Sequence, residues 1–106
     1  MFKYILAIIV SLLAATAAGA DELLIFTMPG CRPCAHMKVM LTKHPELVRD
    51  FQVVYFDITE AEETARVFNV GSVPTFVRLR EDKEVARVVG AMTERKFKRW
   101  VQQHNP

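Results

Sequence analysis

The sequence has only two cysteines among its 106 residues, so a disulfide scaffold is excluded and the domain must fold on its apolar core. It also lacks an excess of one charge. Its 14 basic and 12 acidic side chains leave a net charge of +2, without the strongly basic surface typical of a nucleic-acid-binding protein. Glycine is scarce, at four residues, and no linker, repeat or low-complexity segment divides the chain. We therefore expect one small domain.

Apolar residues are concentrated at the start of the chain, where they make up sixteen of the first 20 residues. Lys3 precedes an apolar run over Ile5–Leu13, and small residues follow up to Ala18-Gly19-Ala20. This pattern predicts a secretory signal peptide over residues 1–20, cleaved after Ala20. The alternative is an uncleaved membrane anchor, because the stretch reaches the lower limit of the roughly 17–25 residues that span a bilayer. Both place the domain at 21–106 outside the cytoplasm, and we expect a bacterial periplasm.

The remaining sequence predicts an α/β domain. Apolar runs bounded by turn residues predict four strands, at Leu23–Thr27, Gln52–Asp57, Thr75–Arg80 and Glu84–Val89. The first two strands, joined through a helix, should be parallel, and the last two should form an antiparallel hairpin. The expected fold is thus a four-stranded mixed sheet flanked by helices, in the order β-α-β-α-β-β-α.

Helical spacing predicts the three helices. The first begins at about Cys34 and is interrupted by Pro45, with one further turn over residues 46–50. The second opens at Thr59, three residues before a glutamate in the capping-box pattern, and runs through Phe68. The third begins after Thr93 as its N-cap and directs its apolar residues to the core: Phe97, Trp100 and Val101.

Both cysteines lie in one short motif, Cys31–Cys34 (CRPC), between a predicted strand and a predicted helix. At a helix start, the free backbone N–H groups and the positive end of the helix dipole favour a thiolate over a thiol. We expect the more exposed Cys31 to attack a disulfide and Cys34 to resolve the mixed disulfide. Arg32 is expected to tune the pKa of the Cys31 thiol by stabilising its thiolate, which makes the pair more oxidising. Pro33 fixes φ in the first helical turn.

Three segments make the sequence resemble the thioredoxin-like superfamily from Leu23 to about Gln103. FTMPGCRPC is similar to the active-site strand and turn, with a Pro-Gly pair as in glutaredoxins; GSVPTFV is similar to the cis-proline loop and VVGAMTERKFKRWV to the final helix region. The resemblance implies that Pro74 is cis and faces the dithiol. It also implies that the backbone of Val73 pairs with a substrate peptide and that the proline ring prevents metal capture.

The chain departs from that superfamily at several positions. Thioredoxins carry tryptophan before the first cysteine, where this chain has Gly30, and a buried aspartate at the position of Ile25. The lysine that partners this aspartate falls near Tyr55, so the usual proton acceptor is absent. Three alternatives stay open: Asp57 substitutes for it, a water does, or Cys34 reacts more slowly. The acidic residue with which glutaredoxins hold glutathione has no clear match in Gly90-Ala91-Met92-Thr93, so the sequence gives no support for the use of glutathione and leaves this question open.

A metal site is the alternative chemistry for the cysteines. They could bind zinc with His36, or Cu(I) with Met37 and Met40, since thiolates and thioethers are soft ligands. The cysteines and His36 do not share a helical face, and the methionines have core spacing, so we expect no metal. Covalent haem is excluded because Ala35 follows the motif where CxxCH requires histidine.

The sequence thus predicts an extracytoplasmic thiol–disulfide oxidoreductase, with protein thiols and disulfides as substrates and the reductase direction favoured. We expect a monomer that needs no cofactor beyond its own disulfide, and a membrane protein as its redox partner. The alternatives are a metal-binding module and a non-catalytic interaction domain. A basic cluster on the last helix is either a solvated face or a docking patch; its members are Arg95, Lys96, Lys98 and Arg99.

Overall fold

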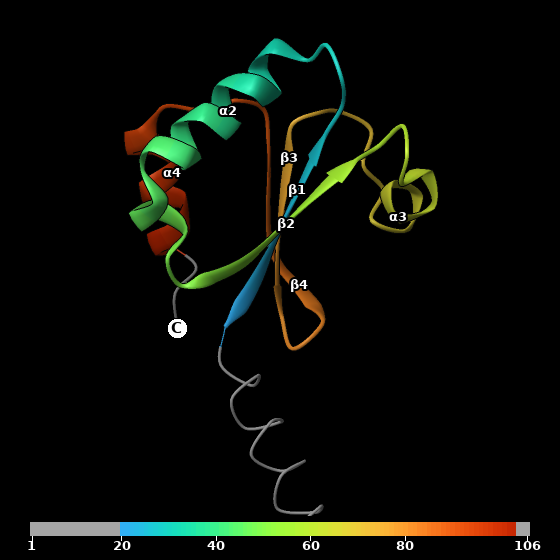
Figure 1. Ribbon diagram of the computed structural model, residues 1–106. Helices are drawn as coiled ribbons and strands as arrows, with labels where there is room; N and C mark the ends of the chain where they lie inside the picture. The colour runs from blue at the N-terminus through green and yellow to red at the C-terminus, as the bar shows by residue number, and fades with distance from the viewer. Residues whose placement is uncertain (1–19, 104–106) are drawn as a thin grey trace, which may run out of the picture.

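The computed structural model describes residues 20–103, so the predicted leader lies outside the described residues except for Ala20. The strands are β1 Asp21–Thr27, β2 Phe51–Asp57, β3 Thr75–Arg80 and β4 Lys83–Val89, and the α-helices are α2 Arg32–Lys43, α3 Glu62–Val67 and α4 Glu94–Gln103 (Figure 1). A short 3₁₀ helix, η1 Pro45–Val48, lies between α2 and β2 and is not labelled in the figure. This order confirms the predicted one, with a short 3₁₀ turn after the first helix. Over residues 20–103, no helix is both long and apolar enough to cross a membrane.

The four strands form one mixed sheet in the order β2-β1-β3-β4 (Figure 1). β1 pairs in parallel with β2 and antiparallel with β3, and β3 pairs antiparallel with β4. The predicted parallel pair and hairpin are both confirmed. The second strand runs parallel to the first because α2 carries the chain back between them.

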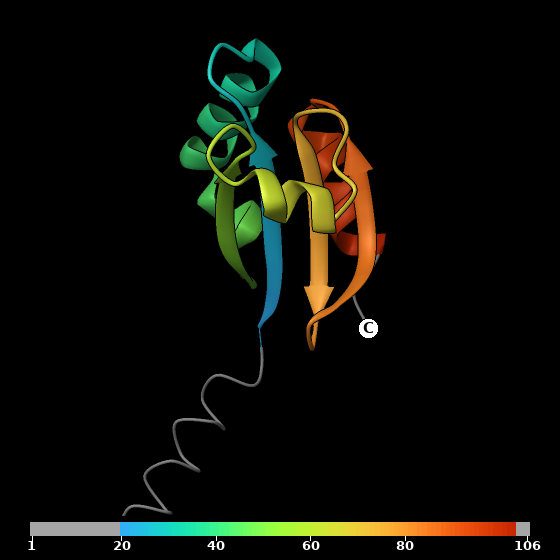
Figure 2. The same cartoon turned by 90° about the vertical axis from the view of Figure 1, so that its right-hand side faces the viewer.

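The central strand β1 is buried on both faces, which explains its continuous apolar run. Leu23 and Ile25 belong to a cluster under α2 and α4, which includes Phe76, whereas Leu24 and Phe26 pack with Ala65 of α3 and its neighbours. Figures 1 and 2 show the same division, with α2 and α4 on one face of the sheet and α3 on the other. The sheet therefore separates two apolar clusters.

The last helix begins and packs as predicted. The Thr93 hydroxyl accepts the backbone N–H of Lys96 at 3.2 Å, which fixes the start of α4. Phe97 and Trp100 are buried, and the ring centroids of Phe97 and Phe76 lie 5.7 Å apart in an edge-to-face arrangement. Val101 is partly buried against the same cluster.

The predicted start of the second helix is wrong. α3 begins at Glu62 with Ala61 as its N-cap, and no side chain caps it. Thr59 is engaged elsewhere, because its N–H and its hydroxyl both donate to Oδ1 of Asp57, at 2.9 and 2.6 Å. This local turn takes the polar groups that a capping box would have used. Phe68 lies just beyond the helix and packs, partly buried, on the second cluster.

A charged side chain is buried on the α4 face of the sheet. Arg78 is 3% exposed, and its Nε donates to Oδ2 of Asp21 at 2.7 Å while its Nη1 donates to the carbonyl of Val101 at 3.0 Å. Arg80 adds a second contact to the same carboxylate, at 3.0 Å from Nη2. Hydrogen bonds and charge from Arg80, and then from Arg78, hold the pKa of the Asp21 carboxyl below its usual value, although burial opposes this.

The β3–β4 hairpin offers a stability prediction. Its two turn residues, Glu81 and Asp82, have φ of 51° and 64°, in the left-handed region that favours glycine. We expect Asp82→Gly to raise the free energy of unfolding by about 0.5–1 kcal/mol in urea titrations, because the strained conformation of a side-chain-bearing residue is relieved. Lys83→Gly, one residue into β4, is the control and should be destabilising; equal effects of the two changes would contradict the prediction.

Candidate functional site

The dithiol lies in the turn that joins the central strand to α2. The Cys31 N–H donates to the carbonyl of Met28 at 3.3 Å and closes this turn. Gly30 has φ of 78°, a conformation that side-chain-bearing residues seldom adopt, so glycine in place of the tryptophan of thioredoxins has a local structural reason. Cys31 is the N-cap of α2, which begins at Arg32, two residues earlier than predicted.

The two cysteines form a disulfide and differ in accessibility. Cys31, which is partly exposed, forms the disulfide with Cys34, which is only 4% exposed. The Sγ of Cys31 also accepts the backbone N–H of Cys34 at 3.1 Å. The first helical turn therefore directs an N–H group at this sulfur, as expected for a site that stabilises a thiolate. Arg32 and Pro33 lie exposed in the same turn.

The Val73–Pro74 segment lies at the same end of the sheet as the dithiol. Its peptide bond is cis, as predicted. Thr75 pairs with Phe26, so the residues just before Thr75 lie beside the end of β1, where the chain turns towards Cys31. The Gly90 N–H donates to the Pro74 carbonyl at 2.8 Å and ties the segment to the end of β4.

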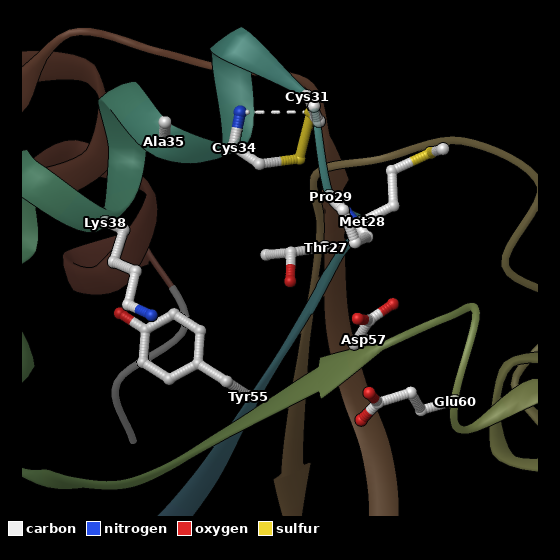
Figure 3. A pocket seen from close by; sticks show the side chains of 11 residues that line it. Thr27, Met28, Pro29, Cys31, Cys34, Ala35, Lys38, Tyr55, Asp57 and Glu60 are labelled. Carbon is white, nitrogen blue, oxygen red and sulfur yellow. Dashed lines mark hydrogen bonds between the residues drawn. A yellow bond between two sulfur atoms is a disulfide. The ribbon is translucent and has the colours of Figure 1, made fainter.

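A cavity of about 460 Å³ opens beside the disulfide, and it brings together residues from β1, β2, α2 and a turn. Figure 3 shows the disulfide and the four ionisable side chains of the lining: Lys38, Tyr55, Asp57 and Glu60. The Lys38 ammonium lies 5.3 Å from the centroid of the Tyr55 ring. Burial raises the pKa of Tyr55 above its usual value.

Lys38 and Glu60 are the ionisable lining residues that the sequence alone does not indicate. Lys38 follows Cys34 by four residues, a spacing that places both on one face of α2 and that a search around the motif could have used. Asp57, one of the predicted substitutes for the usual proton acceptor, lines the cavity. Ile25, at the position of the usual aspartate, is 1% exposed within the core.

The structure does not assemble the alternative metal site around the dithiol. Met37 and Met40 are buried in the core cluster, and the Met37 sulfur accepts the Met92 N–H at 3.3 Å. His36 is exposed on α2, whereas Cys34 is buried. The basic residues of α4 are likewise exposed.

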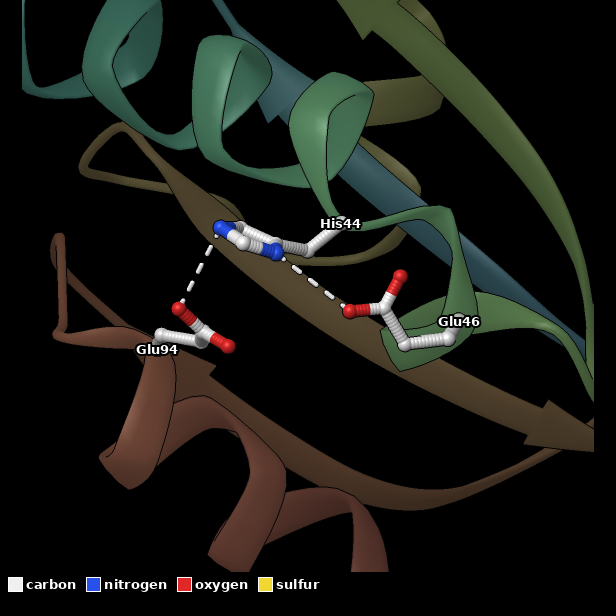
Figure 4. A group of neighbouring side chains, drawn as sticks. All are labelled: His44, Glu46 and Glu94. Atoms are coloured by element: carbon white, nitrogen blue, oxygen red, sulfur yellow. Dashed lines mark ion pairs between the residues drawn. The ribbon is translucent and has the colours of Figure 1, made fainter.

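A separate polar cluster joins the end of α2 to the start of α4 (Figure 4). The His44 ring nitrogens lie 3.3 Å from carboxylate oxygens of Glu46 and Glu94, one on each side. The three ligand atoms lie within 4.8 Å of one another, close enough to hold a cation. Glu46 and Glu94 are exposed, His44 is partly exposed, and each ring nitrogen of His44 already faces a carboxylate, so we interpret the cluster as a surface polar contact between the end of α2 and the start of α4.

Comparison with known protein families identifies a family that this chain matches and several relatives. Residues 10–105 match the family described as thioredoxin-like domain. The chain is 34% identical to Thioredoxin-2 of Saccharomyces cerevisiae over 76 residues, which cover 70% of this chain and 73% of that protein. It is 38% identical over 82 residues to the TPR repeat-containing thioredoxin TDX of Arabidopsis thaliana and 32% identical over 66 residues to its Thioredoxin H2. The match to the TPR repeat-containing thioredoxin covers 74% of this chain and 20% of that protein. The match to Thioredoxin H2 covers 62% of this chain and 50% of that protein.

Solved structures show the same fold. The X-ray structure of Fasciola hepatica thioredoxin superposes with a TM-score of 0.74 at 25% identity, covering 93% of this chain and 94% of that one. A mutant thioredoxin from Halobacterium salinarum gives a TM-score of 0.73 at 25% identity, with 86% of this chain and 80% of that one covered. The predicted resemblance and the predicted fold class are thereby confirmed.

Proposed function

The chain belongs to the thioredoxin-like family and is a thioredoxin-like oxidoreductase with a Cys31–Cys34 disulfide, and from this we propose that it exchanges disulfides with protein substrates outside the cytoplasm. The observation that carries the proposal is the disulfide at the start of α2, between one partly exposed and one buried cysteine. A substrate protein can reach only the first of these sulfurs, so the two thiols take different roles.

The reaction proceeds by two thiolate attacks. The Cys31 thiolate attacks a substrate disulfide, forms a mixed disulfide and releases one substrate thiolate. The Cys34 thiolate then attacks Sγ of Cys31, which restores the internal disulfide and releases the second substrate thiol. Val73, at the same end of the sheet as the dithiol, offers backbone groups to an extended substrate segment, and Pro74 lies next to it in that surface.

We propose the reductase direction, which the similarity to thioredoxins supports. Arg32 acts against it, because a cation beside the Cys31 thiolate stabilises the reduced form and raises the reduction potential. The signal-like leader supports a periplasmic location, and a reductase there needs a membrane protein to supply its electrons. Glutathione, for which Gly90–Thr93 offers no acidic anchor, is not proposed as the reductant.

Measuring the reduction potential tests this function. The purified protein is equilibrated in glutathione buffers of graded redox ratio, and the fraction of Cys31–Cys34 disulfide is read by alkylation and mass. A value near about −270 mV supports a reductase, whereas one near about −120 mV would reverse the proposed direction and indicate an oxidase. Thiols that resist both oxidation and alkylation would contradict an oxidoreductase altogether.

A further inference from the structure

The attack of Cys34 on the mixed disulfide needs a base to accept the Cys34 proton. The identity of that base is inferred on the premise that the proposed function is correct. Cys34 must lose its proton before it can attack the mixed disulfide, because the thiolate is the nucleophile. Its side chain is 4% exposed, so bulk water reaches it poorly. The proton must therefore pass to a group within the cavity that Cys34 lines.

Three of the groups around that cavity are unsuited to accept it. Lys38 carries an ammonium, which has no lone pair to receive a proton. Tyr55 keeps its own proton at neutral pH, since burial raises its pKa further. Thr27 is the residue of β1 that lines the cavity, and it is not ionisable; its hydroxyl donates to the Phe56 carbonyl at 3.4 Å. Two carboxylates are left, those of Asp57 and Glu60.

Asp57 is the better placed of the two. Its residue pairs directly with Thr27 in the parallel β1–β2 register, at the end of the strand that leads to the dithiol turn. Its Oδ1 is held by both hydrogen bonds from Thr59, which fixes the carboxylate. Glu60 is exposed in the following turn. In the view of Figure 3, Thr27 lies between the two sulfurs and the Asp57 carboxylate.

We propose that Asp57 accepts the proton of Cys34 through water in this cavity during resolution of the mixed disulfide. The Cys34 S–H bond breaks and its proton moves to the carboxylate, while the resulting thiolate attacks Sγ of Cys31. The Cys31–Cys34 disulfide forms, the bond from Cys31 to the substrate sulfur breaks, and the electron pair leaves with that sulfur. The proton then passes from Asp57 to the departing thiolate, so the dithiol is oxidised by two electrons and the substrate disulfide reduced by two.

The test separates the two attacks in time. The reduced full-length protein is mixed with an excess of an aromatic disulfide, and the coloured thiol is followed by stopped flow. Attack by Cys31 releases the first equivalent, and resolution by Cys34 releases the second. In Asp57→Asn, which keeps the oxygen that Thr59 binds, we expect an unchanged first phase at neutral pH. The second phase should slow by about a hundredfold, the low end of what a positioned base contributes.

The pH profile and two matched variants make the test specific. In Asp57→Asn the second phase should rise in proportion to hydroxide concentration, while Glu60→Gln should behave as the wild type. Asp57→Glu, which restores a carboxylate, should recover most of the rate. Loss of a negative charge alone would act in the opposite direction, because it would stabilise the Cys34 thiolate and speed resolution.

The outcomes distinguish this inference from the function on which it rests. A second phase of wild-type rate or faster in Asp57→Asn would overturn the role of Asp57 and leave the oxidoreductase intact. A wild-type protein that releases no first equivalent would instead contradict the proposed function. Slowing in Glu60→Gln with none in Asp57→Asn would assign the proton to Glu60 and overturn the proposal.

Discussion

Replacing Cys31 by serine is expected to reduce turnover of a disulfide-bonded protein to the rate of the chemical reductant alone. The attacking sulfur is lost, and Cys34 is too buried to replace it. Replacing Cys34 by serine should also stop turnover but leave the first attack intact, so the protein accumulates as a mixed disulfide. Mass spectrometry of the quenched reaction detects this adduct by the added mass of the substrate.

The two serine variants are matched controls for each other. Each removes one sulfur and the same disulfide, so any loss of stability is shared and only the reaction step differs. A mixed disulfide trapped in Cys31→Ser, and absent in Cys34→Ser, would reverse the assigned roles. Full turnover in either variant would show that the Cys31–Cys34 pair is not the site of exchange.

The second large effect concerns stability. Asp21→Asn is expected to lower the free energy of unfolding by about 3 kcal/mol, because the buried Arg78 loses the charged carboxylate that its Nε contacts at 2.7 Å. The bond from Arg78 to the Val101 carbonyl stays in the variant, and the neutral side chain of asparagine replaces the carboxylate. Urea unfolding followed by tryptophan fluorescence measures the change, since Trp100 lies in the core cluster under the same sheet face. Asp50→Asn, at an exposed aspartate, is the control.

The same ion pair predicts acid sensitivity. The folded-state pKa of Asp21 is lowered, chiefly by Arg80, so the unfolded chain binds this proton more readily. The stability from Asp21 is therefore fully present above the unfolded pKa, about 4, and is lost as the pH falls through the lower folded value. Unfolding midpoints between about pH 2 and 6 should fall less steeply in Asp21→Asn than in the wild type. Parallel curves would show that Asp21 titrates alike in both states.

Features encoded within a few neighbouring residues could be predicted from the sequence. The apolar run at Leu23–Thr27 indicated a strand, and Thr93 indicated the start of α4, because each depends on local pattern. The predicted cap at Thr59 failed because Asp57, two residues earlier, competed for its hydroxyl. The sequence motif alone does not show which of two competing local hydrogen-bonding patterns forms, because the outcome depends on the backbone conformation of residues 57–62.

Features that depend on strand register could not be predicted. Arg78 reads as a solvent-facing charge, yet it is buried because β3 is central and α4 covers that face. The cavity beside the dithiol likewise needs β2 to bring Tyr55 and Asp57 alongside β1, about thirty residues away in sequence. The role of the two cysteines could be predicted without knowing the strand register, since two cysteines separated by two residues at a helix start already indicate redox chemistry.

The strand order has a consequence for when the protein can fold during synthesis. β1 is the first strand to emerge, yet it lies inside the sheet, between β2 and β3. Its hydrogen bonds on one side await residues 51–57, and those on the other side await residues 75–79. A chain that folds as it is synthesised therefore holds an unpaired apolar strand until residues 75–79 have been added. The two cysteines are made before the sheet that buries Cys34 has formed, so both sulfurs are accessible to other thiols and oxidants until then.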